Sequence, residues 1–223
     1  MRETAVLDRV KDGYTTGARS LASRSIVGLA RTRVTPNALT ASGVTLCLTA
    51  SVIVLFENRN PWLFYWTGAV LFVVGSILDI LDGALARAGG KATAFGAFLD
   101  STTDRVGEGA MLGAIALVFH RHDHAAAIAL TFAAVVGSFL VSYTRAKAEA
   151  LGLRGDVGWG SRAERVVVIT AGLVLAPLSI WLLVAAIGLL TVTAWSTVLQ
   201  RILHVRKQLL SLGGSTTNDP DQR

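Results

Sequence analysis

Long apolar segments recur along this chain of 223 residues, and they constrain its fold more than any other feature. A helix of about 20 apolar residues is long enough to cross the hydrocarbon core of a bilayer. Six segments reach or approach that length, near residues 37–56, 62–86, 95–119, 125–149, 162–180 and 181–205. Only 16% of the residues are charged, whereas soluble domains average about 25%. The sequence therefore predicts an all-α membrane protein with six transmembrane helices.

The segments that flank this predicted six-helix transmembrane domain, residues 37–207, have a different composition. Residues 1–36 combine basic residues with apolar positions on one helical face, which predicts a cytoplasmic amphipathic helix on the membrane surface before the first span. A partly ordered basic tail fits the same pattern equally well. Residues 208–223 end in the polar run LGGSTTNDPDQR and predict a disordered C-terminal tail.

The basic residues predict how the chain is oriented in the membrane. With six spans, both termini and the second and fourth connections lie on one side. All but three of the 21 basic residues fall on that side or beside it; the exceptions are Arg59, Arg105 and Arg121. Cytoplasmic segments carry such an excess, so we expect a multi-pass protein of the cell (inner) membrane with both termini in the cytoplasm. No nucleic-acid-binding motif accompanies the net charge of +6, so no nucleic-acid partner is expected.

Four aspartates lie at the cytoplasmic ends of the second and third predicted spans. Asp79 and Asp82 are three residues apart, and Asp100 and Asp104 are four apart, so each pair shares one helix face. The connection AGGKATAF is short, which returns the chain antiparallel and lets the two pairs face each other. Four carboxylates at one depth repel one another unless cations neutralise them. Hard divalent cations prefer oxygen ligands, so the pattern predicts a site for Mg²⁺ or Mn²⁺.

Two divalent ions held by shared carboxylates can clamp a phosphoryl group during its transfer. The small residues Gly83, Ala86 and Gly96 are interleaved with the aspartates and leave room for a nucleotide diphosphate, and Arg87 can hold a phosphate oxygen. Two other interpretations stay open. The carboxylates could be structural partners of basic residues, or they could mark the ion path of a divalent-cation transporter. A transporter predicts carboxylates near the middle of the membrane on several helices.

A resemblance to a known family rests on the run from Asp79 to Asp104. Its spacing, D-x2-D-G-x2-A-R-x8-G-x3-D-x3-D, is similar to the signature of the CDP-alcohol phosphatidyltransferases. The resemblance implies six transmembrane helices and a homodimer. The orientation expected from the basic residues puts the active site on the cytoplasmic side, and membrane lipids are expected partners. The resemblance also implies that the phosphatidyl group of a CDP-linked lipid passes to an alcohol, with release of CMP.

The same resemblance implies roles for individual residues. Asp79, Asp82, Asp100 and Asp104 would be the ligands of two Mg²⁺ ions, with Mn²⁺ as the other candidate metal. Asp104 would also be the general base that takes the proton of the attacking hydroxyl. The residues that would contact CDP-diacylglycerol are Asn37, Ala38, Leu39, Thr40, Gly83, Arg87 and Thr93.

A second basic stretch, SYTRAKAEALGLRGDVGWGSRAER from Ser142 to Arg165, bears on the acceptor alcohol. Arginines at three helix ends could form one pocket for a phosphate group, although ordinary cytoplasmic positive charge explains each arginine singly. The residues expected in this pocket are Ser142, Arg145, Arg162, Arg165 and Arg201.

Within the family, this stretch resembles the actinobacterial phosphatidylinositol phosphate synthases, which implies inositol 1-phosphate as the acceptor and phosphatidylinositol phosphate as the product. The chain departs from that pattern at Arg145 and Lys147, where lysine and arginine stand in the opposite order, and at Ala163, where proline is usual. Glycerol 3-phosphate or another alcohol therefore stays open as the acceptor.

Three histidines, His120, His122 and His124, form a second candidate metal tract. They fall on the predicted non-cytoplasmic side, away from the aspartates. We expect a solvated loop there.

Overall fold

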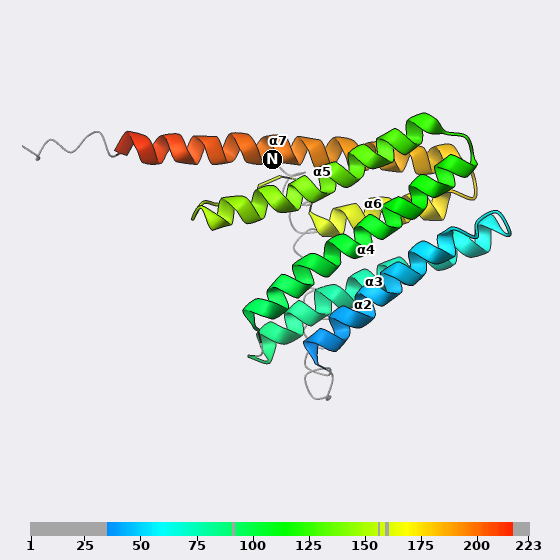
Figure 1. Cartoon of the computed structure of the whole chain (residues 1–223), viewed down its shortest axis with the longest axis horizontal. Helices are drawn as coiled ribbons and strands as arrows, with labels where there is room; N and C mark the ends of the chain where they lie inside the picture. The colour runs from blue at the N-terminus through cyan, green and yellow to red at the C-terminus, as the bar shows by residue number, and fades with distance from the viewer. Residues whose placement is uncertain (1–34, 91, 156, 159–160, 216–223) are drawn as a thin grey trace, which may run out of the picture.

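The computed structural model describes residues 35–90, 92–155, 157–158 and 161–215. Within them the chain forms α2 (Pro36–Val54), α3 (Pro61–Ala88), α4 (Ala94–Arg121), α5 (Ala125–Ala150), α6 (Arg162–Leu175) and α7 (Ile180–Ser215), and no strand (Figure 1). The predicted all-α fold is confirmed, with one helix at each of the six expected places. The predicted surface helix lies outside the described residues, apart from its last two positions.

Four of the helices begin at a side chain that caps the first turn. Thr35, Asn60 and Thr93 each accept a hydrogen bond from the backbone N–H three residues later, and Ser161 forms a reciprocal capping box with Glu164. Such caps satisfy backbone donors that have no partner inside the helix. They fix where α2 and α4 start, and both starts border the site described below.

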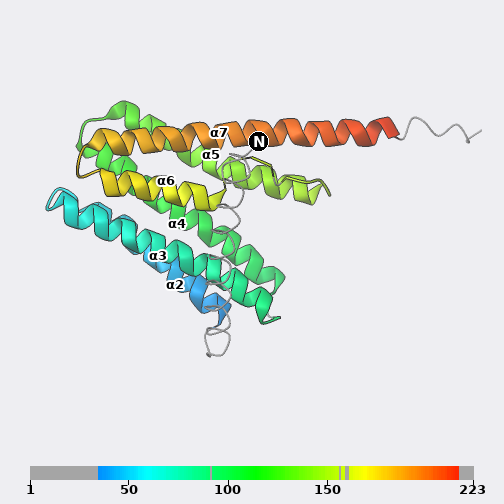
Figure 2. The same cartoon turned by 180° about the vertical axis from the view of Figure 1, so that it is seen from behind.

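The helices pack in a closed ring. α2 packs against α3 and α4, α3 against α6, α6 against α7, α7 against α5, and α5 against α4. Figures 1 and 2 show that the start of α2, the α3–α4 connection, the end of α5 and the start of α6 lie towards one end of the bundle. We call this the aspartate end, because Asp79, Asp82, Asp100 and Asp104 lie near it. The α2–α3, α4–α5 and α6–α7 connections lie at the opposite end.

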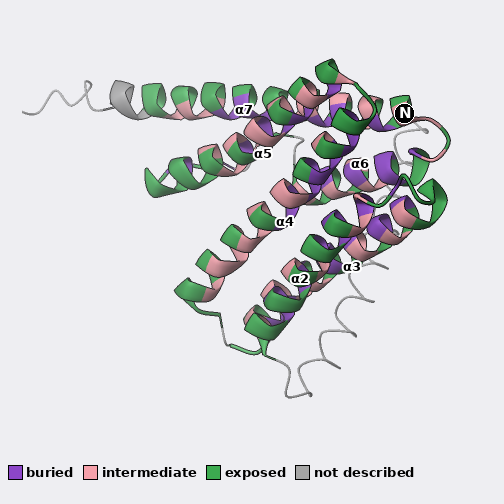
Figure 3. Cartoon of the chain, turned by 45° about the vertical axis from the view of Figure 1, so that its right-hand side comes forward, coloured by how far each residue is buried: buried purple, intermediate pink, exposed green. Residues whose placement is uncertain are grey.

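The core lies inside this ring, while much of the outer surface is apolar. Phe72, Met111, Ile115 and Ile187 are among the large side chains that are fully buried. Figure 3 shows this division between the inner and outer faces of the helices. The exposed large apolar side chains include Val70, Phe132, Trp181 and Val192. An outer surface of this kind suits contact with lipid rather than water.

Four helices, α2, α3, α5 and α7, are long and apolar enough to cross a membrane. α4 is long, but Asp100, Asp104 and Arg105 lie in its first half and Glu108 lies at its middle. α6 has only 14 residues. The structure thus bears out a membrane protein with several apolar helices.

The last two helices were expected near residues 162–180 and 181–205, joined by a short turn around Ala176-Pro177-Leu178. α6 ends at Leu175 and the chain turns at those residues, because Pro177 has no N–H to continue the helix. The predicted start of the tail was wrong. The tail was expected to be disordered from residue 208, but α7 continues to Ser215. No glycine or proline interrupts residues 189–212, so nothing stops the helix there. Residues 216–223 lie outside the described part of the chain.

Two glycines allow α2 and α3 to touch through their backbones. A Cβ added at Gly75 would lie 2.7 Å from the Gly43 carbonyl oxygen and 2.8 Å from Cys47 Sγ. A Cβ added at Gly43 would lie 2.8 Å from the Gly75 carbonyl oxygen. Small residues permit such close packing of membrane helices. The contact sets the distance between Thr40, one turn earlier on α2, and the aspartates of α3.

Candidate active site

Three of the four predicted aspartates meet in space. Asp79 and Asp82 on α3 are 5% and 2% exposed, and Asp100 on α4 is half-buried. One carboxylate oxygen from each of the three lies within 4.8 Å of the others. Asp104 lies one turn further along α4 and is tied to this trio by Arg162, whose guanidinium is 2.7 Å from Asp104 Oδ1 and also contacts Asp79. The two helix faces therefore converge as the spacing predicted.

The chemistry of the trio fits a hard divalent cation. Its donors are all carboxylate oxygens, the ligands that Mg²⁺ and Mn²⁺ favour. Within the described residues, Asp82 Oδ1 is buried and accepts no hydrogen bond, while the Thr40 hydroxyl donates to Asp82 Oδ2. A buried carboxylate oxygen without a partner is unfavourable, and a bound cation removes that penalty. Asp79, Asp82 and Asp100 are the residues that would hold it.

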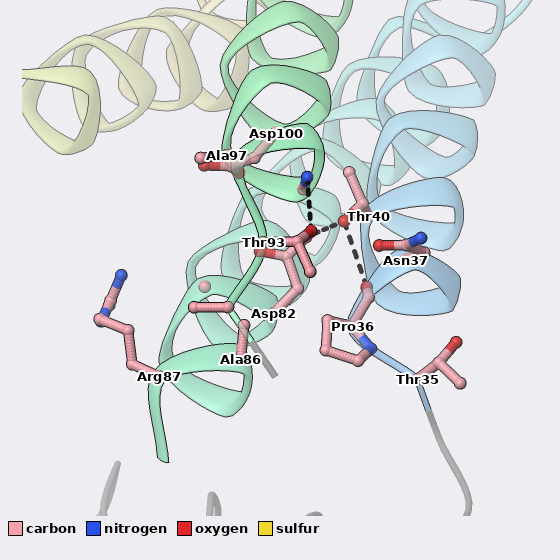
Figure 4. Close-up of a pocket in the computed structure, with 13 residues that line it drawn as sticks. Thr35, Pro36, Asn37, Thr40, Asp82, Ala86, Arg87, Thr93, Ala97 and Asp100 are labelled. Carbon is pink, nitrogen blue, oxygen red and sulfur yellow. Dashed lines mark hydrogen bonds between the residues drawn. The ribbon is translucent and has the colours of Figure 1, made fainter. Parts of the chain in front are cut away.

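A first cavity of about 260 Å³ opens beside Asp82, between the start of α2, the end of α3 and the start of α4 (Figure 4). Five of the seven residues expected to contact CDP-diacylglycerol line it: Asn37, Thr40, Gly83, Arg87 and Thr93. Ala38 and Leu39 do not line it. The helical period explains this difference, because residues three apart share a face whereas the two between them point elsewhere. Ala38 is exposed and Leu39 is buried.

The walls of the first cavity are mostly small. The expected small residues Gly83, Ala86 and Gly96 line it, and so do Ala92 and Ala97, which were not predicted. Thr35 and Pro36 were also missed as lining residues. Thr35 caps α2, and a residue that caps the start of α2 lies at the aspartate end.

A second cavity of about 570 Å³ lies between α4, α5, α6 and α7. All five residues expected to bind the acceptor phosphate line it: Ser142, Arg145, Arg162, Arg165 and Arg201. Asp104, Arg105 and Glu108 line it from α4. Asp100 lines both cavities, so the two spaces meet at the aspartate cluster.

The arginines of the second cavity are held by specific partners. Arg162 contacts Asp79 and Asp104. Arg201 donates through Nε to the Val157 carbonyl oxygen at 2.8 Å and through Nη1 to the Val141 carbonyl oxygen. These contacts tie α6 and α7 to the rest of the aspartate end. They keep positive charge in the wall of the cavity at defined places.

Two further arginines of this cavity pair with glutamates. Arg145 pairs with Glu149 at 2.8 Å on the exposed side of α5. Arg165 pairs with Glu108 through two bonds, Nε to Oε1 at 2.7 Å and Nη2 to Oε2 at 2.9 Å. Glu108 was not among the residues predicted from the sequence. Its position four residues after Asp104, on the same helix face, was the available signal.

The histidine tract lies at the opposite end of the bundle. His122 Nε2 is 3.8 Å from the buried Glu57, which also pairs with Arg121 at 3.1 Å. The His124 ring packs against Trp181 with centroids 4.8 Å apart. Among the described residues, the aspartate trio is the one group of three or more carboxylate, imidazole or thiol side chains close enough to share a metal ion. The tract therefore offers no second metal centre in the part of the chain that is described.

The part of the chain that contains both cavities is similar to known proteins. The sequence model of the CDP-alcohol phosphatidyltransferases matches residues 33–203. The archaetidylinositol phosphate synthase of Pyrococcus horikoshii is 36% identical over 183 residues, which cover 81% of this chain and 88% of that protein. The phosphatidylinositol phosphate synthase of Mycolicibacterium smegmatis is 38% identical over 173 residues, which cover 75% of this chain and 78% of that protein.

Solved structures resemble this fold as well. The phosphatidylinositol phosphate synthase of Mycobacterium tuberculosis with CDP-DAG bound superposes with a TM-score of 0.71 at 31% sequence identity, covering 83% of this chain and 94% of that chain. The structure of that synthase in complex with manganese and citrate has the same TM-score and identity, covering 82% of this chain and 88% of that chain.

Proposed function

Because the chain belongs to the CDP-alcohol phosphatidyltransferase family, we propose that it transfers the phosphatidyl group of CDP-diacylglycerol to inositol 1-phosphate. The products are phosphatidylinositol phosphate and CMP. One observation carries the proposal: a cavity walled by small residues and a cavity walled by arginines meet at Asp100, within the aspartate cluster. Relatives from both archaea and bacteria bear the names of inositol phosphate lipid synthases, which supports the choice of acceptor.

The first cavity is the proposed site of the nucleotide end of CDP-diacylglycerol. Its glycines and alanines allow the diphosphate to lie close to the helices, and Arg87 supplies positive charge at its rim. The polar side chains of Asn37 and Thr93 are available to the cytidine. The cavity opens at the end of the bundle, so the acyl chains can remain beside the apolar outer surface.

The second cavity is the proposed site of inositol 1-phosphate. Its arginines bind the phosphate group of the acceptor and leave a hydroxyl facing Asp104. Asp104 accepts the proton as the hydroxyl oxygen bonds to the β-phosphorus of CDP-diacylglycerol, and the bond from that phosphorus to the CMP oxygen breaks. Arg162 lies 2.7 Å from Asp104 Oδ1 and keeps that carboxylate pointed into the site.

We propose Mg²⁺ as the metal, two ions in number, with Mn²⁺ as a substitute. Asp79, Asp82 and Asp100 would hold the metal together with Asp104. This assignment is supported by the oxygen donors and by Asp82 Oδ1, which accepts no hydrogen bond from any described residue. Bound divalent ions would neutralise the negative charge that develops on the transferred phosphoryl group and on the leaving CMP.

The proposed setting is the cell (inner) membrane, crossed by all six helices, with both termini and the aspartate end in the cytoplasm. The excess of basic residues on that side supports the orientation. The short α6 and the charged first half of α4 suit a site at the membrane rim, where a lipid enters sideways and a polar acceptor enters from water. We also propose a homodimer, on the resemblance to the family alone.

Glycerol 3-phosphate is the main alternative acceptor, because its phosphate would suit the same arginines. No described feature favours the divalent-cation transporter. The clustered carboxylates lie on two helices near one end of the bundle, and the family match covers residues 33–203.

The test is CMP release from CDP-diacylglycerol by the purified full-length protein with a panel of acceptors. Inositol 1-phosphate should give a kcat/KM at least tenfold above that of glycerol 3-phosphate or of unphosphorylated inositol. A preference for glycerol 3-phosphate would overturn the acceptor but keep the reaction class. Absence of acceptor-dependent CMP release with every alcohol would overturn both.

A further inference from the structure

The pair formed by Glu108 and Arg165 is almost completely buried in the wall of the second cavity. The exposed fractions are 7% for Glu108 and 5% for Arg165. Both carboxylate oxygens accept bonds from the guanidinium, at 2.7 and 2.9 Å. Two parallel bonds between charged groups fix the plane of the guanidinium as well as its position. The side chain of Arg165 is therefore held in one orientation.

Two ion pairs join α4 and α6 in the described part of the chain, and the pair of Glu108 and Arg165 is one of them. Asp104 contacts Arg162 and Glu108 contacts Arg165, so acids four residues apart on α4 meet arginines three residues apart on α6. Both links cross the inside of the helix ring beside the second cavity. Only the link through Asp104 reaches the aspartate cluster. The link through Glu108 is left without a part in the proton transfer or in the proposed metal site.

The arginines of α6 occupy unfavourable positions in their own helix. Arg162 is the first residue of α6 and Arg165 the fourth. The N-terminus of a helix carries partial positive charge, which disfavours basic side chains in the first turn. A buried glutamate opposite Arg165 offsets this penalty and the loss of hydration. Helix stability alone therefore gives no reason for arginine here, whereas an anion-binding cavity does.

We propose that Glu108 is a positioning residue for the acceptor: it presets Arg165 to bind a phosphate group and thereby makes the enzyme select phosphorylated alcohols. This inference rests on the proposed function. Glu108 does not contact the reacting atoms in this account and acts through Arg165. When Glu108 is neutralised, the guanidinium loses its bidentate partner and its fixed plane. The phosphate-bearing acceptor then loses its advantage over the same alcohol without phosphate.

The test compares E108Q with wild type and with E57Q, a matched control. Glu57 is also a buried acid that pairs with an arginine, Arg121 at 3.1 Å, but it lies at the opposite end of the bundle. For each protein, kcat and KM are measured with inositol 1-phosphate and with unphosphorylated inositol, and the affinity for inositol 1-phosphate is measured by calorimetry. E108Q should raise the KM and Kd for inositol 1-phosphate about tenfold or more, the effect of losing a charged hydrogen bond, and leave the KM for CDP-diacylglycerol unchanged.

The ratio of kcat/KM for the two acceptors distinguishes a Glu108 that orients Arg165 from a Glu108 that only stabilises the fold. A loss of structure lowers turnover of both acceptors alike, so E57Q should keep the wild-type ratio of kcat/KM for the two. An unchanged ratio and unchanged Kd in E108Q would overturn the proposal. If E108Q fails to fold, E108D keeps the charge but shortens the side chain, and the same shift in ratio is expected. If the wild type itself neither binds nor uses inositol 1-phosphate, the proposed function fails and the role of Glu108 fails with it.

Discussion

The substitution G75A tests how closely α2 and α3 must pack to build the site. The new Cβ would lie 2.7 Å from the Gly43 carbonyl oxygen, whereas ordinary contact begins at 3.4 Å, so the two backbones must separate by about 0.7 Å. Overpacking of this kind costs about 1–3 kcal/mol. The movement also separates Thr40 from Asp82, whose hydrogen bond joins the two helices beside the first cavity. Displacement of a catalytic group by about 1 Å can reduce the rate about 100-fold.

We therefore expect G75A to melt several degrees below wild type in the same detergent, and to release CMP at least tenfold more slowly. The matched control is G113A on α4, where an added Cβ meets nothing within 4 Å. Alanine is a better helix former than glycine by about 1 kcal/mol, so G113A should match or exceed the wild-type melting temperature with unchanged activity. If G75A and G113A behave alike, α2 and α3 do not touch at this point, and the distance between them does not control the site.

Three further substitutions probe separate parts of the site. D104N removes the proposed general base and should lower kcat about 100-fold or more while CDP-diacylglycerol still binds; a near-wild-type rate would exclude Asp104 as the base. T40V deletes the hydroxyl that donates to Asp82 and should lower the rate of CDP-diacylglycerol turnover about tenfold. T40S keeps the hydroxyl and should retain most of the activity. Equal rates in the two variants would refute the role of that hydrogen bond. R87A should raise the KM for CDP-diacylglycerol and leave the KM for inositol 1-phosphate unchanged. The opposite pattern would show that the substrates assigned to the two cavities must be reversed.

Helix positions followed from local signals in the sequence. The expected start at residue 162 is the observed start of α6, where Ser161 caps the helix, and the expected start at residue 125 is that of α5. α6 ends at Leu175, beside the turn expected around Ala176-Pro177-Leu178, because Pro177 cannot continue the helix. The length of α7 was underestimated because polarity was taken as disorder, although a polar run without glycine or proline can continue a helix.

The convergence of the aspartates was predictable because it depends on spacing within two neighbouring helices. Asp79 and Asp82 share a face of α3, and the short connection to α4 leaves little choice of partner for Asp100. The contents of the first cavity were predictable only in part. A continuous segment of α2 was expected to line it, but the helical period selects Asn37 and Thr40.

The ion pairs between α4 and α6 were not predictable from the sequence. Glu108 and Arg165 are 57 residues apart, and their contact depends on how α5 and α7 complete the ring. The same holds for Arg162, which was expected to face only the acceptor but contacts Asp79 and Asp104. Spacing along one helix identifies a shared face, whereas the partner across the bundle is set by tertiary packing.

The central claim is that the aspartate cluster catalyses a metal-dependent transfer between two substrates in adjoining cavities. The most direct measurement incubates the purified protein with CDP-diacylglycerol and inositol 1-phosphate and quantifies CMP and the lipid product together. We predict CMP and phosphatidylinositol phosphate in equal amounts with Mg²⁺, none of either with EDTA, and recovery when excess Mg²⁺ is restored. Equal turnover in EDTA, or CMP release without a matching lipid product, would contradict the account.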